Sequence, residues 1–454
     1  MNIYIHLEIS ARELDSKLLL AVNAASRGHE VIISDQESII KGLERKFLRP
    51  GIYFTKSLTP GKSKIINHNK ILNSGCKITS IDEEAGLVDY GYQKFALNRY
   101  SEKTLNQASA VFAWGLEDFK TLKKNFPKHI KKIYMTGSPR VDLWRPNFFG
   151  YWKKKNKRIK KPFLLIPSNF SAGLAVMSFY ERMKINKNGG YLDRDPELLK
   201  KSIKNESERY KLIGYFIEAI KYLAHQNKSY HIVVRPHPTE SFETWKILLD
   251  KTPNVTVTKE GEISLLVKNA FAILHNGCTT ALEASFFNKP IITYSPFKFN
   301  FSRELANDLG QKVTSIKQLS KKIDQILLKN LKTKKKLNQT ISKILVNKIF
   351  VDEKETASKK IIKIWENIGK KELSKSNNWF LYKLSLKVMR INGALHRFVK
   401  KDTKLKKNIK FPQFEKEKIL FKINKLIKIL KINHSLKCEF LSDRTILIRK
   451  KQTF

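Results

Sequence analysis

Along the first 150 residues, short apolar runs alternate with segments whose apolar residues recur at helical spacing. The segment ARELDSKLLLAVNAASRG, residues 11–28, has this helical pattern and ends at Gly28, a residue type that commonly closes a helix. Apolar strands separated by amphipathic helices are typical of a parallel, doubly wound sheet. The strands predicted in this part are Ile3–Leu7, Glu30–Ser34, Gly51–Thr55, Cys76–Ile81, Ala110–Trp114 and Ile133–Thr136.

A lysine-rich stretch, residues 151–162, interrupts the alternation and is predicted to be a linker. A second alternating series follows it, with a long helix near 206–226. Its expected strands are 163–169, 231–238, 255–260, 270–277 and 290–296. We therefore predict an α/β protein with two Rossmann-like lobes, residues 1–150 and 163–330, and closing helices at 331–370. In such sheets ligands bind outside the carboxyl ends of the strands.

The last 84 residues have a different character. Residues 379–399 and 415–432 carry apolar side chains at helical spacing opposite lysines, which predicts a basic amphipathic helical extension over 371–454. This extension holds 23 Lys and Arg against 6 Asp and Glu, a net charge of +17. Basic amphipathic helices bind well to anionic membrane surfaces. Packing of both helices on the lobes explains the pattern equally well, so both interpretations stay open.

The net charge of the whole chain is +47. Such a charge favours a polyanionic partner, either nucleic acid or an anionic membrane, although a lysine-rich, nucleotide-biased genome would also produce it. Three scattered cysteines without metal-ligand spacing fit a reducing cytoplasm. The chain shows no signal-peptide pattern and no apolar run of about 18 residues, the length that spans a bilayer. We expect a cytoplasmic protein, peripheral on the inner face of the membrane if it binds one.

The sequence VVRPHPTE, residues 233–240, places a guanidinium and an imidazole directly after an apolar strand. Prolines hold both side chains rigidly, and arginine and histidine suit the binding of phosphate. We therefore expect Arg235, His237 and Pro238 to bind the phosphate of a donor. A proline-flanked turn with an incidental histidine is the alternative.

A second polar junction, HNGCTTALEA at residues 275–284, follows the strand predicted at 270–277. Its glycine allows close backbone approach, its threonines can cap the next helix, and the amino terminus of that helix attracts phosphate. A glutamate one turn into the helix suits ribose hydroxyls or its own helix cap. The expected donor-binding residues here are His275, Asn276, Gly277, Thr279, Thr280 and Glu283. An ordinary capped helix is the alternative.

An acidic stretch, DEEAG at residues 82–86, follows a predicted strand of the first lobe. A carboxylate there could deprotonate a hydroxyl group, whereas a solvated acidic loop is the alternative. Other candidates are Ser168 and Asn169 for donor phosphate, and Glu8, Arg12 and Arg140 on the acceptor side. The DRD triplet at 193–195 lacks a preceding strand, so no metal site is expected. Neither a dinucleotide fingerprint nor a P-loop is present.

These motifs resemble a known group of enzymes. RPHP followed by HNGCTTALEA and NKPII is similar to the donor-binding half of GT-B-type glycosyltransferases and of their epimerase and glycerophosphotransferase relatives. The segments EISARELDSKLLLAVNAASRGHEV, DEEAG and GSPRVDLW resemble the bacterial surface carbohydrate biosynthesis family. The resemblance covers roughly residues 1–330 and implies a nucleotide-sugar donor bound by the second lobe.

Sialyl- and Kdo-type transferases use an acidic D/E-D/E-G stretch as base and an HP pair for the CMP phosphate. By resemblance, Asp82, Glu83 and Glu84 correspond to the first, and His237 with Pro238 to the second. Ala85 precedes the glycine where the family has none, which leaves the choice among the three carboxylates open.

The prediction is a metal-independent glycosyltransferase without a cofactor. It would move a sugar, for example a CMP-linked ulosonic acid, from a CMP- or UDP-linked donor to a surface-polysaccharide or lipid-linked acceptor. A CDP-alcohol glycerophosphotransferase, a sugar-nucleotide 2-epimerase and a basic nucleic-acid-binding protein are the alternatives. Aromatic residues of the extension lie on its apolar seam rather than among the lysines, which counts against nucleic acid.

Overall fold

The computed structural model describes residues 1–87, 92–152, 162–170, 174–188, 191–226, 229–298, 304–329, 343–369, 376–399 and 411–451. The chain forms two compact units, one made of Met1–Tyr151 together with Leu345–Phe454, and one made of Trp152–Ile344. Most of the predicted linker (153–161) and the first part of the predicted closing helices (331–342) lie outside the described residues.

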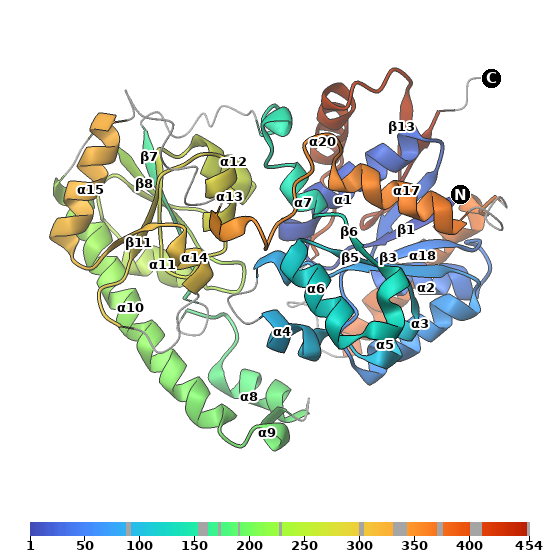
Figure 1. The fold of residues 1–454 in the computed structure, drawn as a ribbon, viewed down its shortest axis with the longest axis horizontal. Helices are drawn as coiled ribbons and strands as arrows, with labels where there is room; N and C mark the ends of the chain where they lie inside the picture. Colours follow the sequence, from blue (N-terminus) through green and yellow to red (C-terminus); the bar gives the residue numbers. More distant parts are fainter. Residues whose placement is uncertain are drawn as a thin grey trace. The chain divides into compact units, whose positions relative to one another are not determined.

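The first unit contains an eight-stranded sheet in the order β13-β14-β2-β1-β3-β4-β5-β6 (Figure 1). Strands β1 to β6 are parallel, because each is followed by a helix that returns the chain to the same end of the sheet. The strands are β1 (Asn2–His6), β2 (Glu30–Ser34), β3 (Gly51–Thr55), β4 (Lys77–Ile81), β5 (Ala108–Ala113), β6 (Ile133–Met135), β13 (Leu436–Ser442) and β14 (Thr445–Lys450).

Helices cover this sheet. They are α1 (Ser10–Ser26), α2 (Gln36–Glu44), α3 (Lys62–Asn73), α4 (Tyr92–Arg99), α5 (Glu102–Asn106), α6 (Leu116–Asn125), α7 (Pro139–Asp142), α17 (Ala357–Gly369), α18 (Trp379–Val399) and α20 (Lys416–Ile429). Helix α1 packs against α7, α17 and α20. Trp365 of α17 is fully buried, and its indole N–H donates to the hydroxyl of Thr79 at 2.9 Å, which fixes α17 on the sheet.

The second unit has a six-stranded parallel sheet in the order β12-β11-β10-β7-β8-β9. Its strands are β7 (Phe163–Pro167), β8 (His231–Arg235), β9 (Val255–Val257), β10 (Ala272–His275), β11 (Ile291–Tyr294) and β12 (Gln311–Val313). Its helices are α8 (Phe179–Asn188), α9 (Tyr191–Arg194), α10 (Leu198–Gln226), α11 (Phe242–Leu248), α12 (Ile263–Asn269), α13 (Thr280–Phe286), α14 (Glu304–Asp308) and α15 (Ile316–Lys329). Aromatic residues such as Phe170, Phe216 and Trp245 form the core beneath α10 and α11.

The predicted fold class, α/β with two Rossmann-like lobes, is confirmed. The purely helical extension is wrong at its end, because residues 436–450 form the β13–β14 hairpin. Strand β14 pairs antiparallel with β2 and buries Ile446, Leu447 and Ile448 completely, so the hairpin extends the sheet of the first unit.

The two predicted helices of the extension exist as α18 and α20, and they differ in their surroundings. The apolar face of α20 is buried against α1, and the amine of Lys422 contacts the carboxylate of Asp15 at 2.8 Å. Helix α20 therefore packs on the unit, as the second of the two interpretations expected. Within the described ranges, every helix is too short or too polar to cross a bilayer.

Candidate functional site

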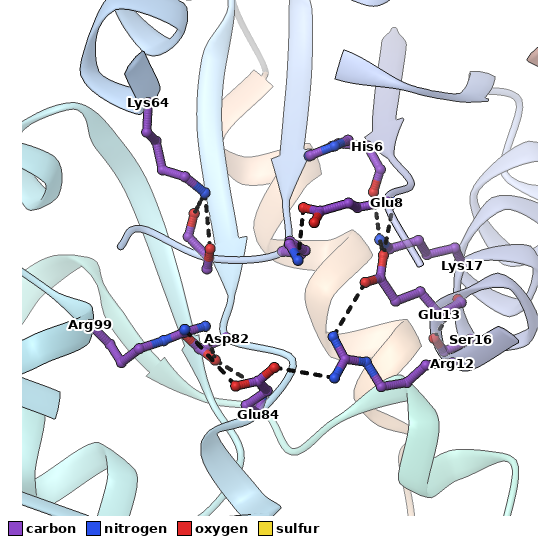
Figure 2. A network of polar contacts seen from close by, with 12 residues as sticks. His6, Glu8, Arg12, Glu13, Ser16, Lys17, Lys64, Asp82, Glu84 and Arg99 are labelled. Carbon is purple, nitrogen blue, oxygen red and sulfur yellow. Dashed lines mark hydrogen bonds and ion pairs between the residues drawn. The ribbon is translucent and has the colours of Figure 1, made fainter. Parts of the chain in front are cut away.

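The acidic stretch lies at the carboxyl edge of the first sheet, directly after β4 (Figure 2). The amide of Glu83 donates to the carbonyl of Lys56 at 3.1 Å, which ties the stretch to the end of the neighbouring β3. The adjacent carboxylates of Asp82, Glu83 and Glu84 thus have three different surroundings, which determine their chemical properties.

Asp82 is fully buried and firmly held. Its carboxylate accepts two hydrogen bonds from the guanidinium of Arg99, at 2.8 and 3.0 Å. The amide of Glu84 donates to the same carboxylate at 3.0 Å, and the indole N–H of Trp114 donates to the carbonyl of Asp82 at 2.7 Å. Because both oxygens are engaged in charge-assisted bonds, Asp82 positions the loop.

Glu84 is half-exposed. Figure 2 shows its carboxylate between the side chains of Arg12 and Arg99. Its carboxylate is 3.2 Å from a guanidinium nitrogen of Arg12 and 3.9 Å from one of Arg99. Burial raises the pKa of Glu84, but Arg12 and Arg99 outweigh this effect and lower it. A carboxylate with a lowered pKa is a weak base, so Glu84 is poorly suited to accept a proton.

Glu83 differs from both neighbours. Glu83 is only 5% exposed. Its carboxylate makes no hydrogen bond or ion pair with any residue that the structure describes. Burial raises the pKa of Glu83, Lys17 opposes the rise, and Glu13 adds to it. A buried carboxylate with a raised pKa is the usual form of a general acid or base.

A buried ion pair of α1 lies beside these carboxylates. The amine of Lys17 contacts the carboxylate of Glu13 at 2.5 Å, one helical turn away, and both side chains are fully buried. The same amine donates to the carbonyl of His6 at the end of β1, also at 2.5 Å. Removing either partner would leave an uncompensated charge in the interior, so the two side chains depend on each other.

The structure gathers the predicted acceptor-side residues around this pair. Glu8 pairs with Lys56 at 2.8 Å, and its amide donates to Glu13 at 3.1 Å. Arg12 lies between Glu13, at 3.7 Å, and Glu84. Sequence reasoning missed Lys17, Lys56 and Arg99, although the charged pair Glu13–Lys17 inside an apolar helical pattern was a visible signal.

Arg140, the third predicted acceptor-side residue, lies in α7 with its guanidinium 5.5 Å from the ring centre of Trp144. Its positive charge also opposes the increase in the pKa of Glu83 that burial causes. The preceding Gly137 has a φ of +78°, and a Cβ there would lie 2.5 Å from the carbonyl oxygen of Phe350. The turn that presents Arg140 therefore requires glycine.

In the second unit, Glu240 joins the loops that follow β7 and β8. This fully buried carboxylate accepts from the hydroxyl of Ser168, from the amide of Phe170 at 2.7 Å and from the indole of Trp245 at 2.9 Å. The hydroxyl of Ser168 also accepts from the amide of His237 at 3.1 Å. Ser168 is thus engaged with the chain, and Glu240 is a residue that the sequence analysis did not identify.

The two residues of the RPHP motif point to different partners. The ring Nδ1 of His237 accepts from the amide of Thr239 at 3.3 Å, so its neutral form carries the proton on Nε2. The guanidinium of Arg235 donates to the carbonyls of Thr258, at 3.1 Å, and Gly261, at 2.9 Å. Burial lowers the pKa of Arg235 to about 10. Arg235 therefore fixes the loop after β9, Pro238 is exposed, and His237 is half-buried with its Nδ1 also 2.8 Å from the hydroxyl of Thr239.

The loop between β10 and α13 is built on Gly277, which has a φ of +64°. Its amide donates to Asn307 at 2.7 Å, and its carbonyl accepts from the side chain of Asn169, also at 2.7 Å. This last bond joins the loop after β7 to the loop after β10. Asn276 donates to the carbonyl of Tyr294 at 2.8 Å and so positions the same loop.

The other predicted residues of this loop have varied surroundings. His275 is fully buried beneath it, and burial lowers its pKa to about 3. Thr279 takes the N-cap position of α13 without a side-chain capping bond, unlike the expected cap, and Thr280 accepts from the thiol of Cys278 at 3.3 Å. Glu283 accepts from the hydroxyl of Ser264 at 2.5 Å. His275 thus packs beneath the loop. The side chain of Thr279 does not cap the backbone amides at the start of α13.

No cluster of three or more His, Cys, Asp and Glu side chains able to hold a metal occurs among the described residues. Asp195 of the DRD triplet pairs with Lys201 at 3.0 Å.

Comparison with known proteins identifies the fold. No protein-family model and no curated protein matches the sequence. A UDP-GlcNAc 2-epimerase from Methanocaldococcus jannaschii is similar in structure, with a TM-score of 0.50 and 15% identity over 81% of this chain and 100% of that one. An MnaA–UDP structure from S. aureus gives 0.49 and 14% over 83% and 99%, and a glycosyltransferase from Rickettsia africae gives 0.44 and 14% over 82% and 99%. The chain thus has the two-unit α/β fold of the Methanocaldococcus jannaschii protein.

Proposed function

We propose that the protein is a nucleotide-sugar-dependent glycosyltransferase, and that Glu83 is its general base. The observation that supports this most strongly is the position of Glu83, buried at the carboxyl edge of a parallel sheet with a raised pKa. Its two acidic neighbours are neutralised by Arg12 and Arg99, so the surroundings select one of three adjacent carboxylates.

In the proposed reaction, the carboxylate of Glu83 removes the proton from a hydroxyl group of the acceptor. The freed oxygen attacks the anomeric carbon of the donor sugar, and the bond from that carbon to the phosphate oxygen breaks. The electron pair of the broken bond leaves with the nucleotide. A base with a raised pKa accepts the proton more completely as the new bond forms, which is the advantage of burying Glu83.

The second unit is proposed to bind the nucleotide. Its loops after β7, β8 and β10 lie at the carboxyl edge of one sheet, where doubly wound sheets bind their ligands. Asn169 and Gly277 tie two of these loops together, and Ser168 holds the backbone of His237. The imidazole of His237 and the amides of Thr279 and Thr280 are proposed to neutralise the leaving phosphate without a resident metal or other cofactor.

The proposed donor is a CMP- or UDP-linked sugar, and the proposed acceptor is a surface polysaccharide or a lipid-linked precursor. Such an acceptor is made at the inner face of the cytoplasmic membrane, so the proposal places the enzyme in the cytoplasm. Helix α18 is the candidate contact with that membrane, because the apolar face of α20 is covered by α1.

A sugar-nucleotide 2-epimerase is the second candidate, because the fold is shared with a UDP-GlcNAc 2-epimerase. An epimerase also needs an acid–base group, which would remove the proton from the sugar carbon that is inverted. Glu83 suits this role equally well. A CDP-alcohol glycerophosphotransferase fits less well. The glycerophosphotransferases usually carry acidic and serine residues at the position where this chain has HNGCTT.

The first experiment is a thermal-shift screen with CMP, CDP, UDP and GDP. A nucleotide at 100 times its dissociation constant adds roughly 2.7 kcal/mol of stability, which is readily detected. We expect CMP or UDP to protect the wild type and His237→Ala to remove the protection. Equal protection by all four nucleotides, or none by any, contradicts the proposed donor.

Glu83→Gln and its matched control Glu84→Gln test the base. We expect Glu83→Gln to keep nucleotide protection and lose turnover by roughly 100-fold or more, while Glu84→Gln keeps most activity. The reverse outcome would assign the base to Glu84. Incubation with UDP-GlcNAc in D2O without acceptor separates the two reactions, because deuterium at the inverted sugar carbon identifies an epimerase.

A further inference from the structure

Helix α18 has one face packed on the first unit. Tyr382 is fully buried, and its hydroxyl donates to the carbonyl of Ser38 at 3.3 Å. Ser385 and Leu386 are buried beside it, and the helix packs against α2 and β13. This inward face accounts for the folding of α18 onto the unit.

A second apolar face of the same helix points to solvent. Phe380 is 77% exposed and Ile391 is 59% exposed, with three further apolar side chains between them. Their spacing of three and four residues aligns them in one stripe on the helix surface. The stripe consists of Phe380, Leu381, Leu384, Val388 and Ile391. It contrasts with the equivalent face of α20, which is covered by α1.

Basic side chains border the stripe. Lys383 and Lys387 are exposed and form no ion pair with any described residue, and Arg390 lies 3.9 Å from Asp443. The sequence from Trp379 to Val399 contains no acidic residue at all. The exposed side of α18 is therefore both apolar and cationic.

We propose that this stripe docks the protein on an anionic phospholipid surface. Apolar side chains of an interfacial helix enter the boundary between headgroups and acyl chains, and neighbouring lysines attract anionic headgroups. From Phe380 to Ile391 the stripe is about 17 Å long at the helical rise of about 1.5 Å per residue, so it lies along a bilayer surface. This docking does not depend on which sugar reaction the protein catalyses.

Two other occupants explain less of the surface. A second copy of the chain would bring Lys383 and Lys387 close to the same cations, with no acidic residue of α18 to pair with them. A nucleic acid would use the cations and leave an exposed aliphatic stripe, in which Phe380 is the single aromatic side chain, without a partner. A lipid surface satisfies both the charge and the apolar area.

The test is cosedimentation of the full-length protein with vesicles of phosphatidylcholine alone or mixed with phosphatidylglycerol. We expect binding to the mixed vesicles, weak binding to the neutral ones, and a decrease with salt. The triple variant Phe380→Ser, Leu384→Ser, Ile391→Ser removes the apolar stripe and should abolish binding. In Lys383→Ala and Lys387→Ala, each lost lysine should weaken binding about five-fold.

Matched controls come from exposed residues of the second unit. The triple variant Ile203→Ser, Ile247→Ser, Leu328→Ser removes exposed apolar side chains elsewhere, and the double variant Lys200→Ala, Lys221→Ala removes the same charge from α10. Both should bind like wild type. Circular dichroism and thermal unfolding verify that every variant is folded.

Three outcomes overturn the proposal. The wild type fails to bind mixed vesicles, it binds neutral vesicles equally well, or the control variants lose binding as fully as the α18 variants. A dimer that dissociates in the α18 triple variant, without vesicle binding, would assign the stripe to contacts between copies of the chain.

Discussion

The buried pair Glu13–Lys17 gives a prediction whose size follows from the structure. Replacing Lys17 by Met keeps the length of the side chain but leaves the carboxylate of Glu13 buried without its cation. Both side chains are fully buried, and the two atoms of the pair are 2.5 Å apart. Removing one member of such a pair costs about 3–5 kcal/mol of unfolding free energy, because an uncompensated charge stays in the interior.

The pKa of Glu13 gives a similar magnitude. Burial raises this pKa, but Lys17, together with Lys56 and the amide of Glu8, outweighs burial and lowers it from 4.5 to about 2. One pKa unit corresponds to about 1.4 kcal/mol, so this difference amounts to roughly 3 kcal/mol. A carboxyl group with a lowered folded-state pKa stabilises the protein above its unfolded pKa. The contribution is therefore complete at neutral pH and disappears as pH falls from about 4.5 to about 2.

The assay is calorimetric or urea unfolding of the full chain, with attention to the transition of the first unit. Lys41→Met is the matched control, because Lys41 and Glu37 form the same type of pair, one turn apart, on the surface of α2 at 2.9 Å. An exposed pair of this kind contributes at most about 0.5 kcal/mol. The double variant Glu13→Gln, Lys17→Met should recover much of the loss, since neither charge then remains buried.

Two results would refute this reasoning. If Lys17→Met destabilises the protein no more than Lys41→Met, the pair is not desolvated as the structure indicates. If the double variant is as unstable as Lys17→Met alone, lost packing rather than the unpaired carboxylate causes the effect.

Three further predictions concern the site. Because the pKa of Glu83 is raised, kcat/KM should rise with pH through a midpoint above 4.5 in a pH–rate profile. Lys17→Met should move this midpoint higher, since Lys17 is the main group that opposes the increase in the pKa of Glu83. Glu240→Ala leaves three donors without their acceptor and should cost at least about 3 kcal/mol by urea unfolding, whereas Glu240→Gln should retain most stability. Gly137→Ala should cost at least about 1 kcal/mol in thermal unfolding, because φ is +78° and the new Cβ meets the carbonyl oxygen of Phe350; a neutral result would mean that the turn relaxes.

Strands that are buried in the sheets could be predicted from the sequence, because burial determines their pattern of apolar residues. Strands β2 and β3 have the predicted bounds, because the interior of a parallel strand buried on both faces is a continuous apolar run. Strand β12 has two exposed residues out of three and gives no such signal. The hairpin β13–β14 was missed because its pairing with β2 joins distant parts of the chain.

The site was predictable to the same extent. The DEEAG stretch was identified because it directly follows a buried strand, and its position at the carboxyl edge is as expected. The proposal of Glu83 rather than Asp82 or Glu84 rests on the contacts of Arg99 and Arg12, which are separated from these carboxylates in sequence. Lys17 was missed because a helical lysine is ordinarily solvated, and only the nearby carboxylate and carbonyl make its burial tolerable.

The pairing of β14 with β2 constrains how the protein can mature during translation. The ribosome delivers β2 early and the hairpin only after the entire second unit, so the nascent first unit has an open sheet edge and an uncovered α1 for most of synthesis. An open edge invites pairing with other chains. A premature stop after residue 344 would therefore yield an aggregation-prone fragment rather than a smaller folded protein, and chaperones that hold nascent chains should matter more for the first unit than for the second.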